Sequence, residues 1–89
     1  MITTELTIIN KLGLHARAAA KLATTANRFN CKIQLTTSKK SVDCKSVMSL
    51  MLLAAAKGTN IQLQCDGQDE QTANCTIIEL INNRFDEEE

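Results

Sequence analysis

A chain of 89 residues can form one domain around a single modest hydrophobic core. Ten basic residues balance ten acidic ones and only two residues are aromatic, so the chain offers neither a basic surface nor stacking groups for nucleic acid. No apolar run is long enough to span a bilayer and no N-terminal signal pattern appears, which predicts a cytoplasmic protein without membrane insertion.

The first predicted elements are a strand and a helix joined by a loop. Residues 2–9 alternate between apolar and polar side chains, which is typical of a strand with one buried face. The loop at residues 10–14 contains a glycine. Residues 16–29 repeat apolar side chains at helical spacing, which predicts a helix. Its inner face would consist of Ala19, Leu22, Ala23, Ala26 and Phe29.

The middle of the chain predicts a hairpin and a second helix. Residues 31–36 and 42–44 both alternate, and a polar turn would join them as antiparallel strands, although the turn lacks the Asn-Gly signature of a two-residue loop. Ser46 is a suitable N-cap for a helix over residues 47–57. Gly58 would end this helix in a left-handed conformation.

This second helix is apolar on nearly every side. We expect its sheet-facing side to consist of Leu50, Leu53 and Ala54. The outward side would then carry Val47, Met48 and Met51. An exposed apolar patch that includes methionine suits a surface that binds several partners. Ordinary scattered surface residues are an equally good interpretation of the same pattern.

The last part of the chain predicts a fourth strand at residues 61–66 and a helix at 70–85 with Asp69 as its N-cap. Residues 86–89 are an acidic run and are expected to be a solvated tail. The order βαββαβα over residues 1–89 predicts one α+β domain. Its architecture would be a two-layer open-faced sandwich, with a four-stranded, mostly antiparallel sheet covered on one face by three helices.

Four cysteines, Cys31, Cys44, Cys65 and Cys75, form no C-x-x-C pair, and only one histidine could join them. A metal site is therefore not expected, and no cofactor motif is present. Cys31, Cys44 and Cys65 fall in step with apolar residues of the predicted strands. They are best interpreted as small buried side chains in the reduced state.

His15, the single histidine, lies where the first loop meets the first helix. The first amides of a helix lack intrahelical partners and attract anions, and Arg17 adds a cation with a planar donor fork. This combination could hold a phosphoryl group on an imidazole nitrogen. No acid–base pair, metal cluster or glycine-rich phosphate loop accompanies it. The sequence therefore indicates one nucleophile that accepts a group and passes it on, rather than an enzyme active site.

Two motifs in register carry a resemblance to a known family. The stretch Gly-Leu-His-Ala-Arg-Ala-Ala at residues 13–19 and Lys-Ser-Val-Met at residues 45–48 closely resemble HPr, the histidine-containing phosphocarrier of the bacterial phosphoenolpyruvate-dependent phosphotransferase system. The resemblance covers essentially the whole chain, including the Lys-Gly-Thr step at residues 57–59. It implies a stoichiometric carrier that is not an enzyme.

The resemblance also implies roles for individual residues. His15 would accept a phosphoryl group on Nδ1 from phosphorylated enzyme I and pass it to a IIA domain. Arg17 would orient and partly neutralise the phosphoryl group, and the backbone amides of Ala16 and Arg17 would contribute at the helix start. Partner proteins would dock on Val47, Met48, Met51 and Ala20. The carrier would work as a monomer.

Ser46 matches the position that HPr kinase/phosphorylase modifies in many relatives, although the sequence fits a plain N-cap equally well. Ala18 stands where many relatives have proline, and alanine also occurs in a paralogue of a regulatory, nitrogen-related branch. A carrier in such a branch, without sugar transport, is therefore an alternative. A module that binds through its apolar patch and is never phosphorylated is a third hypothesis. A ferredoxin-like metal or RNA-binding domain would also fit the element order. The chain lacks the C-x-x-C pair expected for the metal site and the aromatic residues expected for RNA binding.

Overall fold

The computed structural model describes residues 1–87. Its elements follow the predicted order, with a short additional helical turn near the C-terminus. Their bounds are β1 (Ile2–Thr7), α1 (Ala16–Ala26), β2 (Lys32–Thr36), β3 (Ser41–Asp43), α2 (Val47–Leu53), β4 (Asn60–Asp66), α3 (Glu70–Asn82) and η1 (Arg84–Asp86).

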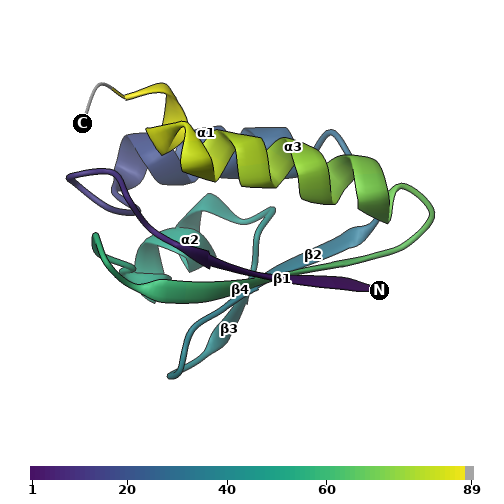
Figure 1. The fold of residues 1–89 in the computed structure, drawn as a ribbon, viewed down its shortest axis with the longest axis horizontal. Helices are drawn as coiled ribbons and strands as arrows, with labels where there is room; N and C mark the ends of the chain where they lie inside the picture. Colours follow the sequence, from purple (N-terminus) through teal and green to yellow (C-terminus); the bar gives the residue numbers. More distant parts are fainter. Residues whose placement is uncertain (88–89) are drawn as a thin grey trace.

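The sheet has four strands in the order β1-β4-β2-β3, and every neighbouring pair is antiparallel. The β2–β3 hairpin is formed as predicted, with Leu35 opposite Val42. Helices α1 and α3 lie together over one face of the sheet (Figure 1), and α2 packs against α1 and β3. The predicted open-faced α+β sandwich is confirmed.

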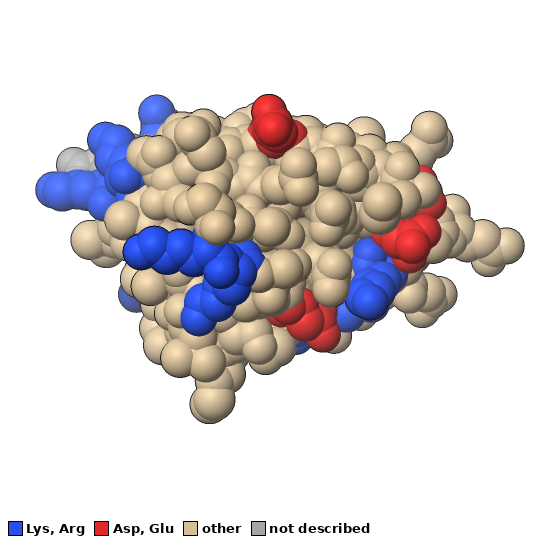
Figure 2. Space-filling model, turned by 90° about the horizontal axis from the view of Figure 1, so that it is seen from below, with Lys and Arg blue, Asp and Glu red and all other residues tan. Residues whose placement is uncertain are grey.

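The opposite face of the sheet is open. Figure 2 views the molecule from this side and shows a mostly uncharged surface, with Lys and Arg side chains gathered toward the end where the C-terminus lies. Along β4 the residues alternate as a half-buried strand requires, because Ile61, Leu63 and Cys65 are buried and the residues between them are not. Within residues 1–87, no helix is long and apolar enough to cross a bilayer.

The core lies between the sheet and the helices. Helix α1 contributes mostly alanine, with Ala19, Ala26 and Leu22 fully buried, so its backbone can approach its neighbours closely. Three of the four cysteines are buried as predicted, and Cys75 is exposed. Burial raises the pKa of the Cys44 thiol to about 12, which keeps it protonated and unreactive near neutral pH.

The second helix is shorter than the sequence predicts. It ends at Leu53, because Ala54 already adopts a left-handed conformation with φ of 52°. Gly58 is therefore not its C-terminal stop. Ala54 is exposed and does not face the sheet, and Ala55 takes the buried position instead. A tertiary contact accompanies this early end: the carbonyl of Ala55 accepts a hydrogen bond from the Leu14 amide at 2.8 Å.

The ends of the other two helices also differ from the prediction. Helix α1 ends at Ala26, where the Asn27 side chain donates to the carbonyls of Ala23 and Lys45. Helix α3 ends at Asn82 rather than at residue 85. Asp69 is the N-cap residue of α3, as predicted, and its carbonyl accepts from the Ala73 amide at 3.0 Å, but its side chain makes no capping hydrogen bond.

The Asp69 carboxylate accepts instead from the amides of Asn30 and Cys31, at 2.8 and 2.9 Å. The hydrogen bond from the Asn30 amide is the main reason that the pKa of Asp69 is lowered. This contact ties the start of α3 to the segment that enters β2.

The prediction of a solvated tail over residues 86–89 holds for Asp86, whose side chain is 59 % exposed, and was wrong for Glu87. Asp86 belongs to η1, and the Glu87 side chain is only 17 % exposed. Glu88 and Glu89 lie outside the described residues. The acidic composition of residues 86–89 correctly indicated a polar segment. Composition alone cannot show that one of its carboxylates, that of Glu87, has a specific hydrogen-bond partner.

Candidate functional site

The loop that carries His15 is fixed from both sides by the segment between α2 and β4. The Ile8 amide donates to the Thr59 carbonyl at 3.0 Å, and the Gly58 amide donates to the Ile8 carbonyl at 2.7 Å. Leu14 is buried and is hydrogen-bonded through its amide to Ala55. The position of His15 is therefore set by tertiary contacts on the residues before it.

His15 is the N-cap residue of α1 and has an extended backbone, with φ of −77° and ψ of 178°. Its carbonyl accepts the first helical hydrogen bond, from the Ala19 amide at 2.8 Å. Its side chain does not cap the helix. Within residues 1–87, the amides of Ala16 and Arg17 have no acceptor, so they remain available to an anion held beside them.

The imidazole of His15 contacts Glu87, which follows η1. Its Nε2 lies 2.6 Å from Oε2 of Glu87, and the other oxygen of Glu87 accepts from Nδ2 of Asn10 at 2.8 Å. Nδ1 forms no hydrogen bond with any residue in the described range 1–87. The ring is therefore hydrogen-bonded through Nε2, whereas Nδ1 has no partner within residues 1–87.

Glu87 is stabilised as a carboxylate. Burial acts to raise the pKa of Glu87, but the hydrogen bonds from Asn10 and His15 and the charges of His15 and Arg17 together outweigh it. The pKa of Glu87 therefore lies below its usual value. Near neutral pH this side chain carries a negative charge and can only accept hydrogen bonds.

Arg17 lies on the exposed side of α1 and forms no salt bridge with a residue in the described part of the chain. It lines a shallow hollow of about 360 Å³ together with Ala20 and Lys21. An exposed guanidinium can move to meet a phosphoryl group and later release it. The predicted pair of His15 and Arg17 thus lies at one helix start, with two free amides.

The comparisons with known proteins agree with this geometry. Residues 2–83 match the family model of the PTS HPr component phosphorylation site. The chain belongs to the HPr family. It is 55 % identical to the phosphocarrier protein HPr of Pseudomonas aeruginosa over 86 residues, which cover 96 % of each chain. It is 50 % identical to HPr of Xylella fastidiosa over 88 residues, which cover 99 % of each.

Solved structures support the same assignment. The crystal structure of HPr-C-His from Thermoanaerobacter tengcongensis matches with a TM-score of 0.95 and 37 % identity, and the match covers 100 % of both chains. The resemblance to HPr predicted from the two sequence motifs is therefore confirmed. HPr proteins are phosphocarriers of the phosphotransferase system and not enzymes, so the motif at His15 belongs to a carrier.

In this member of the HPr family, the apolar side chains predicted to face outward are exposed. Val47 is 39 %, Met51 47 % and Met48 72 % exposed. Ala20 is exposed on α1. Sequence reasoning missed Leu52 and Leu12, which are 66 % and 65 % exposed. Leu52 was assigned to neither face of the predicted helix.

Ser46 is the N-cap of α2, as predicted. Its Oγ accepts from the Ser49 amide at 3.2 Å, and its carbonyl accepts from the Leu50 amide. The side chain is only partly buried. Ser46 immediately precedes Val47 and Met48, so a change of charge at its oxygen would lie next to the exposed apolar side chains.

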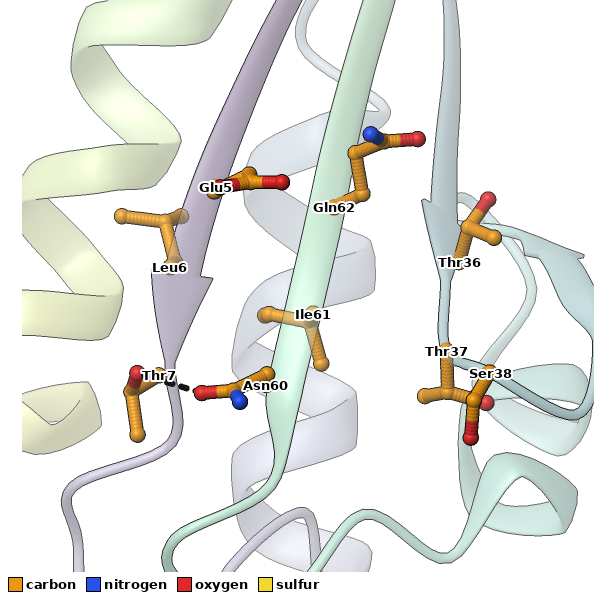
Figure 3. A pocket seen from close by; sticks show the side chains of 9 residues that line it. All are labelled: Glu5, Leu6, Thr7, Thr36, Thr37, Ser38, Asn60, Ile61 and Gln62. Atoms are coloured by element: carbon orange, nitrogen blue, oxygen red, sulfur yellow. Dashed lines mark hydrogen bonds between the residues drawn. The ribbon is translucent and has the colours of Figure 1, made fainter.

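A second hollow, of about 450 Å³, lies on the open face of the sheet (Figure 3). It is lined by the end of β1, the start of β4 and the β2–β3 turn, and Thr7 donates to Asn60 across its rim at 3.0 Å. Glu5 is the only charged residue in its lining. The hollow therefore lacks the cations that a phosphoryl site requires, and it is separate from His15.

Two residues of the site, Asn10 and Glu87, were missed by sequence reasoning. Asn10 was read as part of a loop, yet it is fully buried. Glu87 was assigned to a solvated tail. A buried asparagine next to a strand end gives no distinctive sequence signal, and the contact spans 77 positions along the chain. No group of three potential metal-ligating side chains occurs within residues 1–87.

Proposed function

We propose that His15 accepts a phosphoryl group on Nδ1 from phosphorylated enzyme I and passes it to IIA domains. The observation that carries this proposal is that, within residues 1–87, Nδ1 of His15 has no hydrogen-bond partner and the next two amides, of Ala16 and Arg17, have no acceptor. Arg17 would pair with the phosphoryl oxygens. In such transfers the protein mainly positions the group and stabilises its charge, so no further acid–base apparatus is needed.

A carrier must also release its cargo. If the phosphoryl group were bound very tightly in the ground state, the onward transfer would be slowed. The site fits this requirement because Arg17 is exposed and His15 lies at the surface rather than in a closed pocket.

The test is transfer from enzyme I and phosphoenolpyruvate. We expect the mass of one phosphoryl group to be added to the wild-type chain, in a linkage that is labile in acid and stable in base. His15→Ala should abolish this mass increase completely, because the chain has no other histidine. Ser46→Ala is the matched control and should be phosphorylated normally. A mass increase that persists in His15→Ala would contradict the proposal.

We propose that enzyme I and IIA domains dock on the exposed residues Val47, Met48, Met51 and Ala20. Apolar side chains of this exposure lose water on docking, and methionine adapts its shape to different partners. Contacts of this kind suit a carrier that must exchange partners quickly. The names of the relatives do not favour the alternative of a purely regulatory branch.

We propose that phosphorylation of Ser46 by HPr kinase/phosphorylase regulates this docking. The modification would place about −1.5 to −2 charges beside Val47 and Met48. Ser46→Asp should therefore slow phosphoryl transfer from enzyme I, whereas Ser46→Ala should leave the rate near that of wild type. Initial rates of phosphorylation of the three proteins give the comparison. Equal rates for Ser46→Asp and wild type would rule out this form of control.

We propose that the carrier acts in the cytoplasm, where the soluble components of the phosphotransferase system would meet it, and that it does so as a monomer. Similar structures include an HPr dimer from Thermoanaerobacter tengcongensis, which matches with a TM-score of 0.78 and 37 % identity. Sedimentation of this chain with and without the phosphoryl group would distinguish a monomer from a dimer.

A further inference from the structure

The contact between Glu87 and His15 has a consequence for the chemistry of the ring. We propose that Glu87, held in place by Asn10, fixes the proton of neutral His15 on Nε2 and thereby leaves Nδ1 with the free lone pair. Glu87 acts through the ring, so it is a positioning residue. The inference rests on the proposed phosphoryl transfer for its functional part, but the proton position itself is a property of the unphosphorylated protein.

The first argument is the hydrogen bond itself. Nε2 of His15 and Oε2 of Glu87 are 2.6 Å apart. A carboxylate can only accept, so the hydrogen between these two atoms must belong to the ring nitrogen. In a neutral imidazole, a proton on Nε2 leaves Nδ1 unprotonated. That is the nitrogen that has no partner within residues 1–87.

The second argument is the way Glu87 is held. Asn10 is 0 % exposed, and its Nδ2 donates both to the Gly13 carbonyl at 2.7 Å and to Glu87 at 2.8 Å. Its Oδ1 is buried without a hydrogen-bond partner in the described part of the chain, which is a costly arrangement. The side-chain NH2 group of Asn10 thus points toward the Glu87 carboxylate and the loop of His15, while its Oδ1 is left without a hydrogen bond in the described part of the chain.

The third argument is the backbone that leads to Glu87. Arg84, Phe85 and Asp86 all have left-handed φ values of 56°, 54° and 64°. This conformation costs about 1 kcal/mol or more for each non-glycine residue. It turns the chain back toward α1, where Phe85 is fully buried and its carbonyl accepts from Lys21 at 2.9 Å. The left-handed turn at residues 84–86 therefore places the Glu87 carboxylate next to His15.

The charged groups around Glu87 are consistent with this role. Besides His15, the cation that acts on its carboxylate is Arg17. The neighbouring carboxylate, Asp86, is directed elsewhere, since it accepts from Asn83 at 3.3 Å and lies 3.8 Å from Lys21. Glu87 is thus the acidic side chain of residues 1–87 that contacts the imidazole.

A proton on Nε2 serves both directions of transfer. On acceptance, the lone pair of Nδ1 forms the N–P bond while the bond between phosphorus and the donor breaks, and the donor keeps that electron pair. The product ring retains Nε2–H and is positively charged beside the Glu87 carboxylate. On release, a nucleophile of the acceptor forms a bond to phosphorus while the N–P electron pair returns to Nδ1, and a neutral imidazole leaves. Without the proton on Nε2 the leaving group would be an imidazolide anion, which is far less stable.

The test measures the tautomer of His15 directly, by ¹⁵N NMR of the imidazole at a pH where the ring is neutral. We expect a single Nε2–H tautomer in the wild-type chain. In Glu87→Gln the carboxamide can either accept from or donate to Nε2, so a mixture of both tautomers should appear. Asn10→Ala should shift the population in the same direction. The double variant should match Glu87→Gln, because Asn10 acts through Glu87.

Asp86→Asn is the matched control. It removes one negative charge from the neighbouring residue without touching the imidazole, and it should retain the single wild-type tautomer. In the transfer assay, Glu87→Gln should pass its phosphoryl group on about 10-fold more slowly than Asp86→Asn does. An unchanged tautomer in Glu87→Gln would overturn the inference, even if transfer from enzyme I succeeds. Failure of wild-type phosphorylation would contradict the proposed function but would leave the tautomer result intact.

Discussion

Gly13→Ala is expected to lower the free energy of unfolding by about 3 kcal/mol or more. A Cβ at this position would lie 2.5 Å from the carbonyl oxygen of Ala55 and 2.8 Å from Cα of Ala56. Both atoms belong to the backbone, so neither can move aside like a flexible side chain. In addition, φ is +65°, a conformation that alanine adopts only at a cost.

Urea unfolding of the two glycine variants would measure this effect, with Gly58→Ala as the matched control. Gly58 also has a positive φ, of +90°, but a Cβ there meets no atom within 4 Å. Gly58→Ala should therefore lower the free energy of unfolding only by the cost of the positive φ, about 1 kcal/mol. Equal losses in the two variants would show that the close approach of the His15 loop to Ala55 and Ala56 is not what constrains Gly13.

Phe85→Ala is expected to lower the free energy of unfolding by about 4 kcal/mol, which is a large part of the stability of a small domain. Phe85 is fully buried and packs in the same core as Leu22, Ile77 and Ile81. It also anchors the left-handed turn that leads to Glu87. Truncation would both open a cavity and release the turn, so this variant should also show the mixed His15 tautomers.

Phe85→Leu separates the two contributions. Leucine fills most of the volume and should cost about 1 kcal/mol, with the tautomer unchanged. Thermal or urea unfolding gives the stability, and the same ¹⁵N spectra give the ring state. A loss of less than about 1 kcal/mol in Phe85→Ala would mean that the turn contributes little to the folded state in solution.

Local patterns were sufficient to predict the order of the helices and strands and the position of His15 at a helix start. Alternation along residues 61–66 gave a strand whose buried residues are the expected ones, because a half-buried strand needs a period of two. Ser46 was correctly predicted as an N-cap, since that role depends on an amide three residues away. His15 and Arg17 are two positions apart, so their proximity at a helix start follows from the helix alone.

Predictions failed where a distant segment decides the local conformation. Residues 54–57 have the composition of a helix, yet the chain leaves α2 at Ala54, and Ala55 is buried with its carbonyl hydrogen-bonded to the Leu14 amide. Helix propensity amounts to a few tenths of a kcal/mol per residue, which a buried tertiary hydrogen bond readily exceeds. The end of α2 is therefore determined by the loop that carries His15.

The sequence by itself determined that this chain is one α+β domain, that it belongs to the HPr family, and that its single histidine stands at a helix start beside Arg17. These features depend on residue periodicity and on neighbours within a few positions. Only the tertiary structure decided that Asn10 is buried and that Glu87 reaches Nε2 of His15 across 72 positions. The physical reason is that a charged residue such as Glu87 in an unfolded or extended chain is best solvated by water. It becomes a specific hydrogen-bond partner only when buried Phe85 and a left-handed turn bring it back to the first helix.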